Sequence, residues 1–250
     1  ADLAKRRGDA ANAQRWRKRA ETLRQTVEDR FWMEDQGFYA MAIDGAGKPC
    51  RVKGSNPGHL LFSGLPSPER AKRVTETLLG SPFNAGWGLR TLAVGEARFN
   101  PMSYHNGSIW PHDTALCVLG MARYGERHGV VRMLAGLFET ATHFEMRLPE
   151  LLCGFSRVVG EPPVAYPVAC LPQAWAAGSV FMMLQACLGV TIDGWKGRIQ
   201  LTDPRLPIGV DRLDIDSIVL DDRVVDIKLT RSGVKTRARI NHNGKPRGDR

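Results

Sequence analysis

Asn100-Pro101-Met102-Ser103-Tyr104-His105-Asn106-Gly107-Ser108-Ile109-Trp110-Pro111-His112-Asp113-Thr114 is the stretch around which the chain is organised, because polar, aromatic and ionisable side chains come directly before a helix. Pro111 suits the first helical position, where no backbone N–H is needed, and Asp113 suits the positive end of the helix dipole. An apolar run follows over 115–124. The stretch therefore predicts a helix over 111–124 with a polar loop at its N-terminal end.

Two kinds of helix alternate along the first three quarters of the chain. Segments with one charged face are predicted over 9–31, 68–79 and 130–146, and segments short of charge on every side begin at Pro57, Pro111 and Pro172. A helix that is apolar all round must be buried on all sides, whereas a half-charged helix packs on one side only. The alternation predicts helical hairpins in a double ring, in which inner helices wall a cavity and outer helices cover them.

Three such hairpins make half of a six-hairpin ring, the (α/α)6 toroid. A half ring would leave apolar edges open to water. Either an upstream half of the same polypeptide covers these edges, or the chain closes by self-association, and we favour the upstream half. We therefore expect residues 1–189 to be the C-terminal half of a mainly α toroid.

The sequence changes character after Gly189, where apolar and polar residues begin to alternate. Short strands separated by Pro, Gly and Asp turns are expected around 197–201, 212–216, 223–229 and 236–240. Residues 190–250 are therefore predicted to form a small antiparallel β appendage without chemistry of its own. Its polar end, 243–250, is predicted to be frayed.

The composition is that of an ordinary globular protein, 43% hydrophobic and 24% charged. The net charge of +9 comes from the two ends of the chain, since residues 31–194 carry thirteen basic and thirteen acidic residues. A nucleic-acid-binding protein needs a clustered basic face, so no nucleic-acid partner is expected. Because the five cysteines are widely spaced and show no metal-ligand pattern, we expect buried thiols in a reducing compartment and therefore a cytoplasmic protein; no membrane partner is expected.

The loops before the three charge-poor helices are expected at one end of the ring, because each helix begins with a proline after a polar or aromatic segment. Their side chains supply the donors, acceptors and flat faces that bind sugars. The candidate substrate contacts are Trp87, Arg90, Tyr104, His105, Asn106, Trp110, His112, Asp113, Gln173 and Trp175. The structural alternatives are a capped helix after a solvated loop, tryptophans that belong to the core, and an ion pair between Arg90 and Glu96.

Two carboxylates stand in these loops, Asp113 and Glu150. Enzymes that cleave glycosidic bonds usually use one carboxylic acid to protonate the leaving oxygen and one carboxylate to activate water or to attack. Glu150 follows a proline in an irregular segment, where partial burial is expected to raise its pKa for work as a base. A surface glutamate at a helix end is the alternative. Asp113 is expected to cap its own helix or to bond a sugar hydroxyl rather than to transfer a proton.

The histidines of the loop raise the question of a metal. His105 and His112 match no common spacing of metal ligands, and no cysteine or carboxylate of the sequence completes a set with them. Hydrogen bonding to the substrate or to the loop is the favoured interpretation. No metal and no cofactor are predicted.

Four motifs carry a resemblance to a known group of enzymes: Ala-Gly-Trp-Gly-Leu-Arg-Thr-Leu at 85–92, the stretch 100–113, Pro-Glu-Leu at 149–151 and Pro-Gln-Ala-Trp-Ala-Ala-Gly at 172–178. Together they resemble bacterial glycogen-debranching-type amylo-α-1,6-glucosidases. These belong with the wider six-hairpin glycosidases, which include trehalases and the mannosyl-oligosaccharide and mannosylglycerate glucosidases. The resemblance covers about residues 1–240 and implies an (α/α)6 toroid that hydrolyses an α-glucoside with inversion.

The resemblance also implies roles for particular residues. Glu150 falls at the family's general base, and the segment from Tyr104 to Trp110 falls where the family lines its sugar subsite. The family's general acid is an aspartate of the upstream half, which has no equivalent in this chain.

The combined prediction is part of an inverting glycoside hydrolase that acts on an oligosaccharide or a small glucoside, with Glu150 as the general base. Two alternatives stay open. One is a catalytically inactive carbohydrate-binding toroid, and the other is a disaccharide phosphorylase in which phosphate replaces the water. The phosphorylase would need a glycine-rich or multi-arginine phosphate cradle, and the sequence shows none in these loops.

Overall fold

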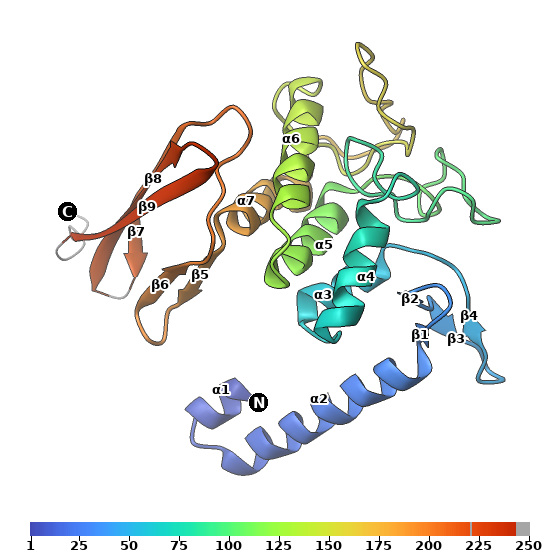
Figure 1. The fold of residues 1–250 in the computed structure, drawn as a ribbon, viewed down its shortest axis with the longest axis horizontal. Helices are drawn as coiled ribbons and strands as arrows, with labels where there is room; N and C mark the ends of the chain where they lie inside the picture. The colour runs from blue at the N-terminus through green and yellow to red at the C-terminus, as the bar shows by residue number, and fades with distance from the viewer. Residues whose placement is uncertain (221, 244–250) are drawn as a thin grey trace.

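The computed structural model describes residues 1–220 and 222–243 (Figure 1). The described helices are α1 (Asp2–Arg6), α2 (Ala10–Arg30), α3 (Asn56–Ser63), α4 (Pro68–Leu79), α5 (Pro111–Arg123), α6 (His128–Thr142) and α7 (Ala174–Leu188). The described strands are β1 (Trp32–Met33), β2 (Phe38–Tyr39), β3 (Ala42–Ile43), β4 (Pro49–Cys50), β5 (Val190–Asp193), β6 (Arg198–Leu201), β7 (Arg212–Leu220), β8 (Arg223–Ser232) and β9 (Lys235–Asn243). From residue 244 onward, the predicted frayed end lies outside the described residues.

The helices between α3 and α7 lie in two layers. Helices α3, α5 and α7 pack side by side, with α5 in the middle, while α4 packs on α3 and α6 packs on both α5 and α7 (Figure 1). The charge-poor segments thus form one row, and the half-charged segments α4 and α6 cover it. This arrangement is that of a helical fold with small antiparallel sheets, which confirms the mainly α prediction for this part of the chain.

Local sequence signals account for several of the helix ends. The Ser67 side chain accepts a hydrogen bond from the Arg70 amide at 3.3 Å and begins α4. Pro111 occupies the first turn of α5, and Gly189 ends α7 with φ 59° and ψ 31°, a left-handed conformation that glycine adopts without strain. Helix α6 was expected to reach residue 146 but ends at Thr142, because Glu145 and Met146 have positive φ.

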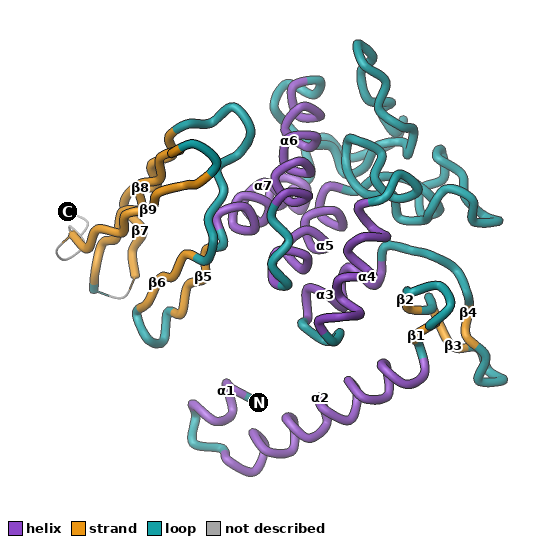
Figure 2. The backbone as a smooth tube through the Cα atoms, viewed as in Figure 1, coloured by secondary structure: helices purple, strands orange, loops and turns teal. Residues whose placement is uncertain are grey.

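The apolar run 38–43 lies between two turn-forming segments, 35–37 and 44–47, a pattern that predicts one short strand, and the structure divides it between two hairpins. The Ala40 amide bonds the Phe31 carbonyl at 2.7 Å, whereas the next amide, of Met41, bonds the Cys50 carbonyl at 3.1 Å. The chain therefore changes partners between these two residues, so that β2 pairs with β1 and β3 pairs with β4 (Figure 2).

Helix α2 departs from the expected outer helix. Its apolar stripe was expected to pack along the helical body, but Trp16 and Leu23 are 44% and 59% exposed, and Ala13 is the one residue of the helix that is buried. In Figure 1, α2 runs apart from the helices above it and approaches them through its C-terminal end. Amphipathic spacing predicted the helix correctly, but it did not predict what covers the stripe.

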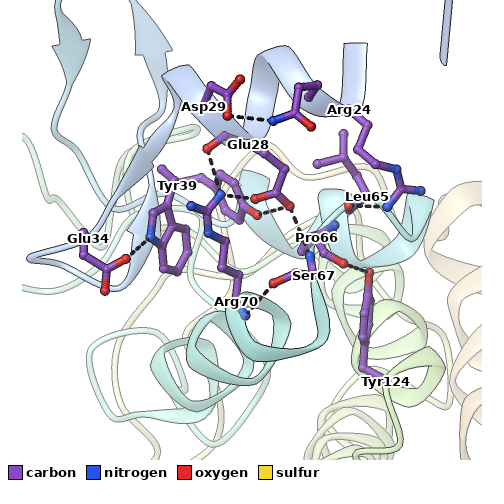
Figure 3. Close-up of polar contacts among 12 residues, drawn as sticks. Arg24, Glu28, Asp29, Glu34, Tyr39, Leu65, Pro66, Ser67, Arg70 and Tyr124 are labelled. Carbon is purple, nitrogen blue, oxygen red and sulfur yellow. Dashed lines mark hydrogen bonds and ion pairs between the residues drawn. The ribbon is translucent and has the colours of Figure 1, made fainter. Parts of the chain in front are cut away.

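A polar network fixes the C-terminal end of α2 to α4 (Figure 3). The Glu28 carboxylate accepts hydrogen bonds from the Tyr39 hydroxyl at 3.0 Å and the Ser67 amide at 3.1 Å, and it forms an ion pair with Arg70. Arg70 also donates to the Glu28 carbonyl at 2.7 Å. Because both side chains of the pair are mostly buried, loss of one partner would leave the other as an uncompensated charge.

The C-terminal strands have a core of their own. Strands β5 and β6 form one hairpin, and β7, β8 and β9 form a three-stranded antiparallel sheet in chain order. Val225, Ile227 and Leu229 alternate along the central strand β8 and are fully buried against apolar residues that include Leu188 and Ile199. This cluster is separate from the one formed by the helices, and the antiparallel strands expected after Gly189 are present.

Within the described residues, no helix combines the length and the apolarity that crossing a bilayer requires.

Candidate active site

Backbone pairing joins the two loops that carry the candidate chemistry. The Ile109 amide donates to the Leu152 carbonyl at 3.0 Å, and the Leu152 amide donates back to the Ile109 carbonyl at 2.8 Å. Ile109 also bridges to Arg90, and Leu152 bridges to Ala165. Four segments far apart in the sequence are thereby held in register, with Trp110 and Glu150 next to the central pair.

Gly154 permits the close approach of these loops. An ideal Cβ at this position would lie 1.7 Å from the Gly107 carbonyl oxygen, far inside van der Waals contact. The Gly154 amide donates to the Pro101 carbonyl at 2.7 Å, which ties the segment after Glu150 to the loop before α5. A residue without a side chain is required here because two backbones meet.

Glu150 is held from two sides. The Tyr104 hydroxyl donates to Glu150 Oε1 at 2.6 Å, and the Cys170 amide donates to Oε2 at 3.2 Å. These two bonds hold the pKa of Glu150 below its ordinary value, and the bond from Tyr104 has the larger effect. The side chains of Cys170 and Gln173 lower the pKa further by smaller amounts. The expected rise of this pKa by burial was therefore wrong, because hydrogen bonds to the ionised form outweigh desolvation.

Aromatic rings continue from Glu150 across the ends of the helices. The Tyr104 ring packs edge-on against Trp110 at 4.8 Å and against Tyr166 at 5.6 Å. His112 lies edge-on to Trp110 at 5.5 Å and stacks on Trp175 at 3.7 Å, with 19° between the ring planes. We call these five side chains the aromatic row. It links the N-terminal end of α5 with that of α7 and has Glu150 at one side.

Tyr104 and His112 are perturbed by their surroundings. The hydrogen bond to Glu150, followed by desolvation, raises the pKa of Tyr104 to about 12. Burial lowers the pKa of His112, against a smaller opposing effect of Asp113. At neutral pH both side chains are therefore uncharged, so the row presents flat neutral faces beside one carboxylate.

Asp113 is buried at the start of α5, where its Oδ1 lies 2.6 Å from Nε2 of His59 on α3. This hydrogen bond, opposed by desolvation, raises the pKa of His59. Asp113 thus joins two neighbouring helices of the inner row as well as standing beside His112.

His105, Asn106, Gln173 and Trp175 lie around the aromatic row. His105 and Asn106 are exposed, and the His105 ring is parallel to Trp110 at 6.2 Å between centroids. Gln173 is the N-cap residue of α7, and its Oε1 is buried without a hydrogen-bond partner in the described structure. Trp175 is 59% exposed, so one face of its indole is open to solvent.

Two of the expected substrate contacts are built into the core. Arg90 is 1% exposed, and its guanidinium donates to the carbonyls of Gly154 at 2.6 Å and Ser81 at 2.9 Å and to Ser156 Oγ at 2.8 Å. Trp87 is 3% exposed and packs with Ile109 and Leu152. Their positions correct the expectation that they touch a substrate: Arg90 ties loops together, by bonds other than the considered pair with Glu96, and Trp87 fills the space beneath them.

The model of the mannosylglycerate hydrolase MGH1-like glycoside hydrolase domain family matches residues 1–148, more than half of the 250 residues. The chain belongs to this family. The match ends just before Glu150, so it covers the Tyr104 and Trp110 end of the site and not the carboxylate. Among the curated proteins, none matches this chain.

Solved structures of glycosidases resemble this member of the MGH1-like family. GH63 mannosylglycerate hydrolase from Thermus thermophilus in complex with glucose aligns with a TM-score of 0.47 at 21% identity, over 61% of this chain and 36% of that chain. Neutral trehalase Nth1 from Saccharomyces cerevisiae aligns with a TM-score of 0.53 at 14% identity, over 68% of this chain and 30% of that chain. At 14% identity the likeness to the trehalase concerns the fold alone. The chain spans about a third of the length of either enzyme.

The structure of this MGH1-like chain adds residues that the sequence did not single out. Tyr166 joins the aromatic row from a proline-rich connection, and His59 reaches Asp113 from a different helix. His59 lies in a polar segment at the start of a charge-poor helix, the same signal that drew attention to 100–114, but the sequence analysis did not single it out. Tyr166 carried no comparable signal.

The same fold assembles a set of possible metal ligands that the sequence did not single out. The ligand atoms of His59, Asp113 and Cys117 all lie within 4.8 Å of one another. Asp113 and Cys117 are one helical turn apart on α5, but the histidine comes from 54 residues upstream. The sequence analysis considered His105 and His112 as metal ligands, and neither of them belongs to this group.

Proposed function

We propose that this chain is the C-terminal part of an inverting glycoside hydrolase that cleaves an α-glucosidic bond, with Glu150 as the general base. The observation that carries the proposal is the 2.6 Å hydrogen bond from Tyr104 to Glu150, which ties a carboxylate to the edge of the aromatic row. A carboxylate beside flat aromatic faces is the arrangement that sugar hydrolysis needs on its water side. Membership in a family of glycoside hydrolase domains supports the same reaction class.

The base would act through a carboxylate that is kept ionised and fixed. Tyr104 and the Cys170 amide each occupy one oxygen of Glu150, and both oxygens keep a further lone pair. A water bound to one of these lone pairs would lose its proton to Glu150 as it attacks the anomeric carbon. The lowered pKa favours the form that accepts this proton.

The substrate would lie along the open side of the aromatic row. We assign stacking against the sugar rings to Trp110 and the exposed face of Trp175. We assign hydrogen bonds to sugar hydroxyls to His105, Asn106 and Gln173, of which the first two are exposed and the third has a buried oxygen without a partner in the described structure. His112 and Asp113 would form the floor between the two helix ends.

The general acid would come from an upstream half of the same polypeptide, as the resemblance implies. An inverting pair requires the acid about 6.5–9.5 Å from the base, with room for a water. In this proposal residues 1–189 are half of an (α/α)6 toroid and residues 190–250 are the β appendage. The exposed apolar side chains of α7 support the assignment, because they form an edge suited to further helices.

A small α-glucoside is the substrate class that we favour. The matching family model is named for mannosylglycerate hydrolase and one similar fold is a trehalase, and both names refer to small glycosides. The choice of a glucosyl unit rests on the trehalase name and on the motifs shared with glucosidases, because mannosylglycerate carries a mannosyl unit. A branched glucan is the second candidate, and it rests on the motifs shared with glycogen-debranching-type glucosidases. All five cysteines are free thiols, which supports a cytoplasmic location of the protein whichever substrate it takes.

The test is Glu150→Gln in the full-length enzyme, with Glu145→Gln as the matched control because Glu145 is exposed and lies outside the aromatic row. We expect the hydrolysis rate to fall at least about 100-fold in the first variant and to stay unchanged in the second. Circular dichroism checks that both variants fold. Proton NMR of the first product from an α-glucoside should show the β-anomer.

Other outcomes would select the alternatives. Near-normal turnover in Glu150→Gln would remove this residue from the mechanism. Calorimetric binding of oligosaccharides by the wild type without sugar release would indicate a carbohydrate-binding module. Release that requires inorganic phosphate would indicate a phosphorylase.

A further inference from the structure

Three side chains of different chemistry converge between two helices of the inner row. Asp113 and Cys117 are four residues apart on α5 and so lie on the same face, and His59 reaches them from α3. Their ligand atoms are all within 4.8 Å of one another. Imidazole, carboxylate and thiol are three donors that bind zinc in proteins.

Glycines make this convergence possible. An ideal Cβ at Gly58 would lie 2.2 Å from Cys117 Sγ, and one at Gly120 would lie 2.5 Å from the Phe62 amide nitrogen. Helices α3 and α5 therefore approach until the backbone of one meets the side chains and backbone of the other. The three donors are presented by rigid elements, which is what a preorganised metal site needs.

One oxygen of the Asp113 carboxylate has no hydrogen-bond partner among the described residues. The residue is 8% exposed, its Oδ1 contacts His59 Nε2, and its Oδ2 is buried without a hydrogen-bond partner among the described residues. A buried carboxylate oxygen without a donor is unfavourable, because it has lost its hydration without a replacement. A bound cation would supply the missing partner.

We propose that His59, Asp113 and Cys117 form a site for one zinc ion. A thiolate favours zinc over magnesium and calcium, while imidazole and carboxylate are compatible with zinc. The His59 side chain keeps 43% of its surface exposed, which leaves an entry path and a fourth position for water. The site would clamp α3 to α5 beside the floor of the aromatic row.

The distances fit an ion after small side-chain adjustments. Zinc bonds of about 2.0–2.3 Å to nitrogen, oxygen and sulfur keep two ligands of a tetrahedral ion about 3.3–3.7 Å apart. The 2.6 Å contact between His59 and Asp113 must therefore open, which rotation of the half-exposed imidazole allows. On binding, the Cys117 thiol proton and the His59 Nε2 proton that faces Asp113 both leave to solvent. The imidazole is then neutral with its proton on Nδ1, and the Nε2 lone pair turns to the metal.

The test is a zinc titration of the full-length polypeptide against a chromophoric chelator. Cys50 and Cys170 are exposed and are first replaced by serine, so that surface thiols do not compete. We expect one zinc per chain, and affinity lower by about 100-fold or more in Cys117→Ala and in His59→Gln. Cys187→Ala is the matched control, because Cys187 is also a buried thiol on an inner helix and lies outside the cluster.

Cobalt(II) gives a second readout that requires no change at the ligands. In the Cys50→Ser, Cys170→Ser protein it should produce a near-ultraviolet charge-transfer band from thiolate to cobalt, and this band should disappear with Cys117→Ala. Stoichiometric binding that survives both Cys117→Ala and His59→Gln would overturn the proposal, as would the absence of binding and of the cobalt band. Neither measurement uses hydrolysis, so the result stands apart from the role of Glu150.

Discussion

Helices α5 and α7 are both short of charge along their length, yet α5 is covered on most sides whereas α7 leaves Trp175, Val180 and Phe181 exposed by 59%, 43% and 76%. Helix α5 lies between α3 and α7 with α6 behind it, and α7 has α5 and α6 as its helical neighbours. A helix that is apolar on all sides is stabilised by burial of its whole surface, and the neighbouring elements set how much of that surface is buried.

The exposed side of α7 continues into a hollow. Residues of α6 and α7, with Met146, Leu148 and Pro172, line a mostly apolar space of about 320 Å³. Phe138 on α6 is 61% exposed beside it. In the described structure the middle helix of the inner row, α5, is therefore covered on most sides, whereas α7, at one end of the row, is exposed on one side. The following variants test how far this difference extends.

The largest effect is expected for Met121→Ala on α5. Met121 is fully buried, so truncation removes apolar contacts and leaves a cavity, at a cost of about 2–5 kcal/mol in the free energy of unfolding. Urea denaturation measures it. Met183→Ala on the covered side of α7 is the control and should cost a similar amount, because Met183 is also fully buried. A negligible cost at Met183 would mean that α7 is loosely packed on both sides.

A smaller loss is expected for Trp175→Ala. This change removes the stack on His112, which joins the N-terminal ends of the two helices, and should cost about 0.5–1.5 kcal/mol. Trp175→Phe retains an aromatic face and should keep most of that stability. If the alanine variant unfolds at the wild-type urea concentration, the exposed end of α7 does not depend on this stack.

The Glu150 carboxylate receives hydrogen bonds from residues next to both helices, α5 and α7. Tyr104, before α5, contributes most to its lowered pKa, and Gln173, at the start of α7, contributes least. We expect the Glu150 pKa, followed by NMR of its side-chain carboxyl, to rise more in Tyr104→Phe than in Gln173→Ala. An equal rise in both would contradict this order.

The same variants predict a pH dependence of stability. A carboxyl whose folded pKa lies below its unfolded value stabilises the protein above about pH 4.3 and loses that contribution as the pH falls through the folded pKa. The stability difference between wild type and Tyr104→Phe should therefore be present at neutral pH. It should shrink in acid, and urea titrations at both pH values measure it.

The smallest effect on this chain is expected for Phe181→Asp. Phe181 is already 76% exposed, so the free energy of unfolding should change by less than about 0.5 kcal/mol. Val234→Asp, in an exposed turn of the β appendage, is the control. If an upstream half covers α7, Phe181→Asp should destabilise the full-length protein and Val234→Asp should not. Equal stability of the two variants in the full-length protein would indicate that no upstream half covers α7.

Local patterns predicted much of the helical fold. The half-charged segment over 9–31 and Pro111 at the first position of the helix that follows 100–110 each predicted a helix from neighbouring residues, and the structure has those helices. The alternation after Gly189 likewise predicted strands. The division of 38–43 between two hairpins was missed because it depends on two carbonyls outside the segment. Those of Phe31 and Cys50 accept hydrogen bonds from the adjacent amides of Ala40 and Met41.

The candidate site was predictable in part. The cluster at 100–114 and Glu150 come together as expected, through the pair of Ile109 and Leu152. Arg90 looked like a sugar contact because an arginine beside a tryptophan suits one, and the carbonyls that bury it come from residues 81 and 154. The shift of the Glu150 pKa was predicted in the wrong direction. The hydrogen-bond donors to its carboxylate, Tyr104 and Cys170, lie 46 and 20 residues away in the sequence.

The sequence by itself determined which segments form helices, which of them are short of charge on every side, and that polar and aromatic residues gather before them. Those properties depend on neighbours within a turn or two of the chain. Only the tertiary structure decided which apolar faces are covered, that Arg90 and Trp87 belong to the interior, and that His59 meets Asp113 and Cys117. Burial and pairing are set by atoms supplied from distant segments, and no local pattern records how those segments meet.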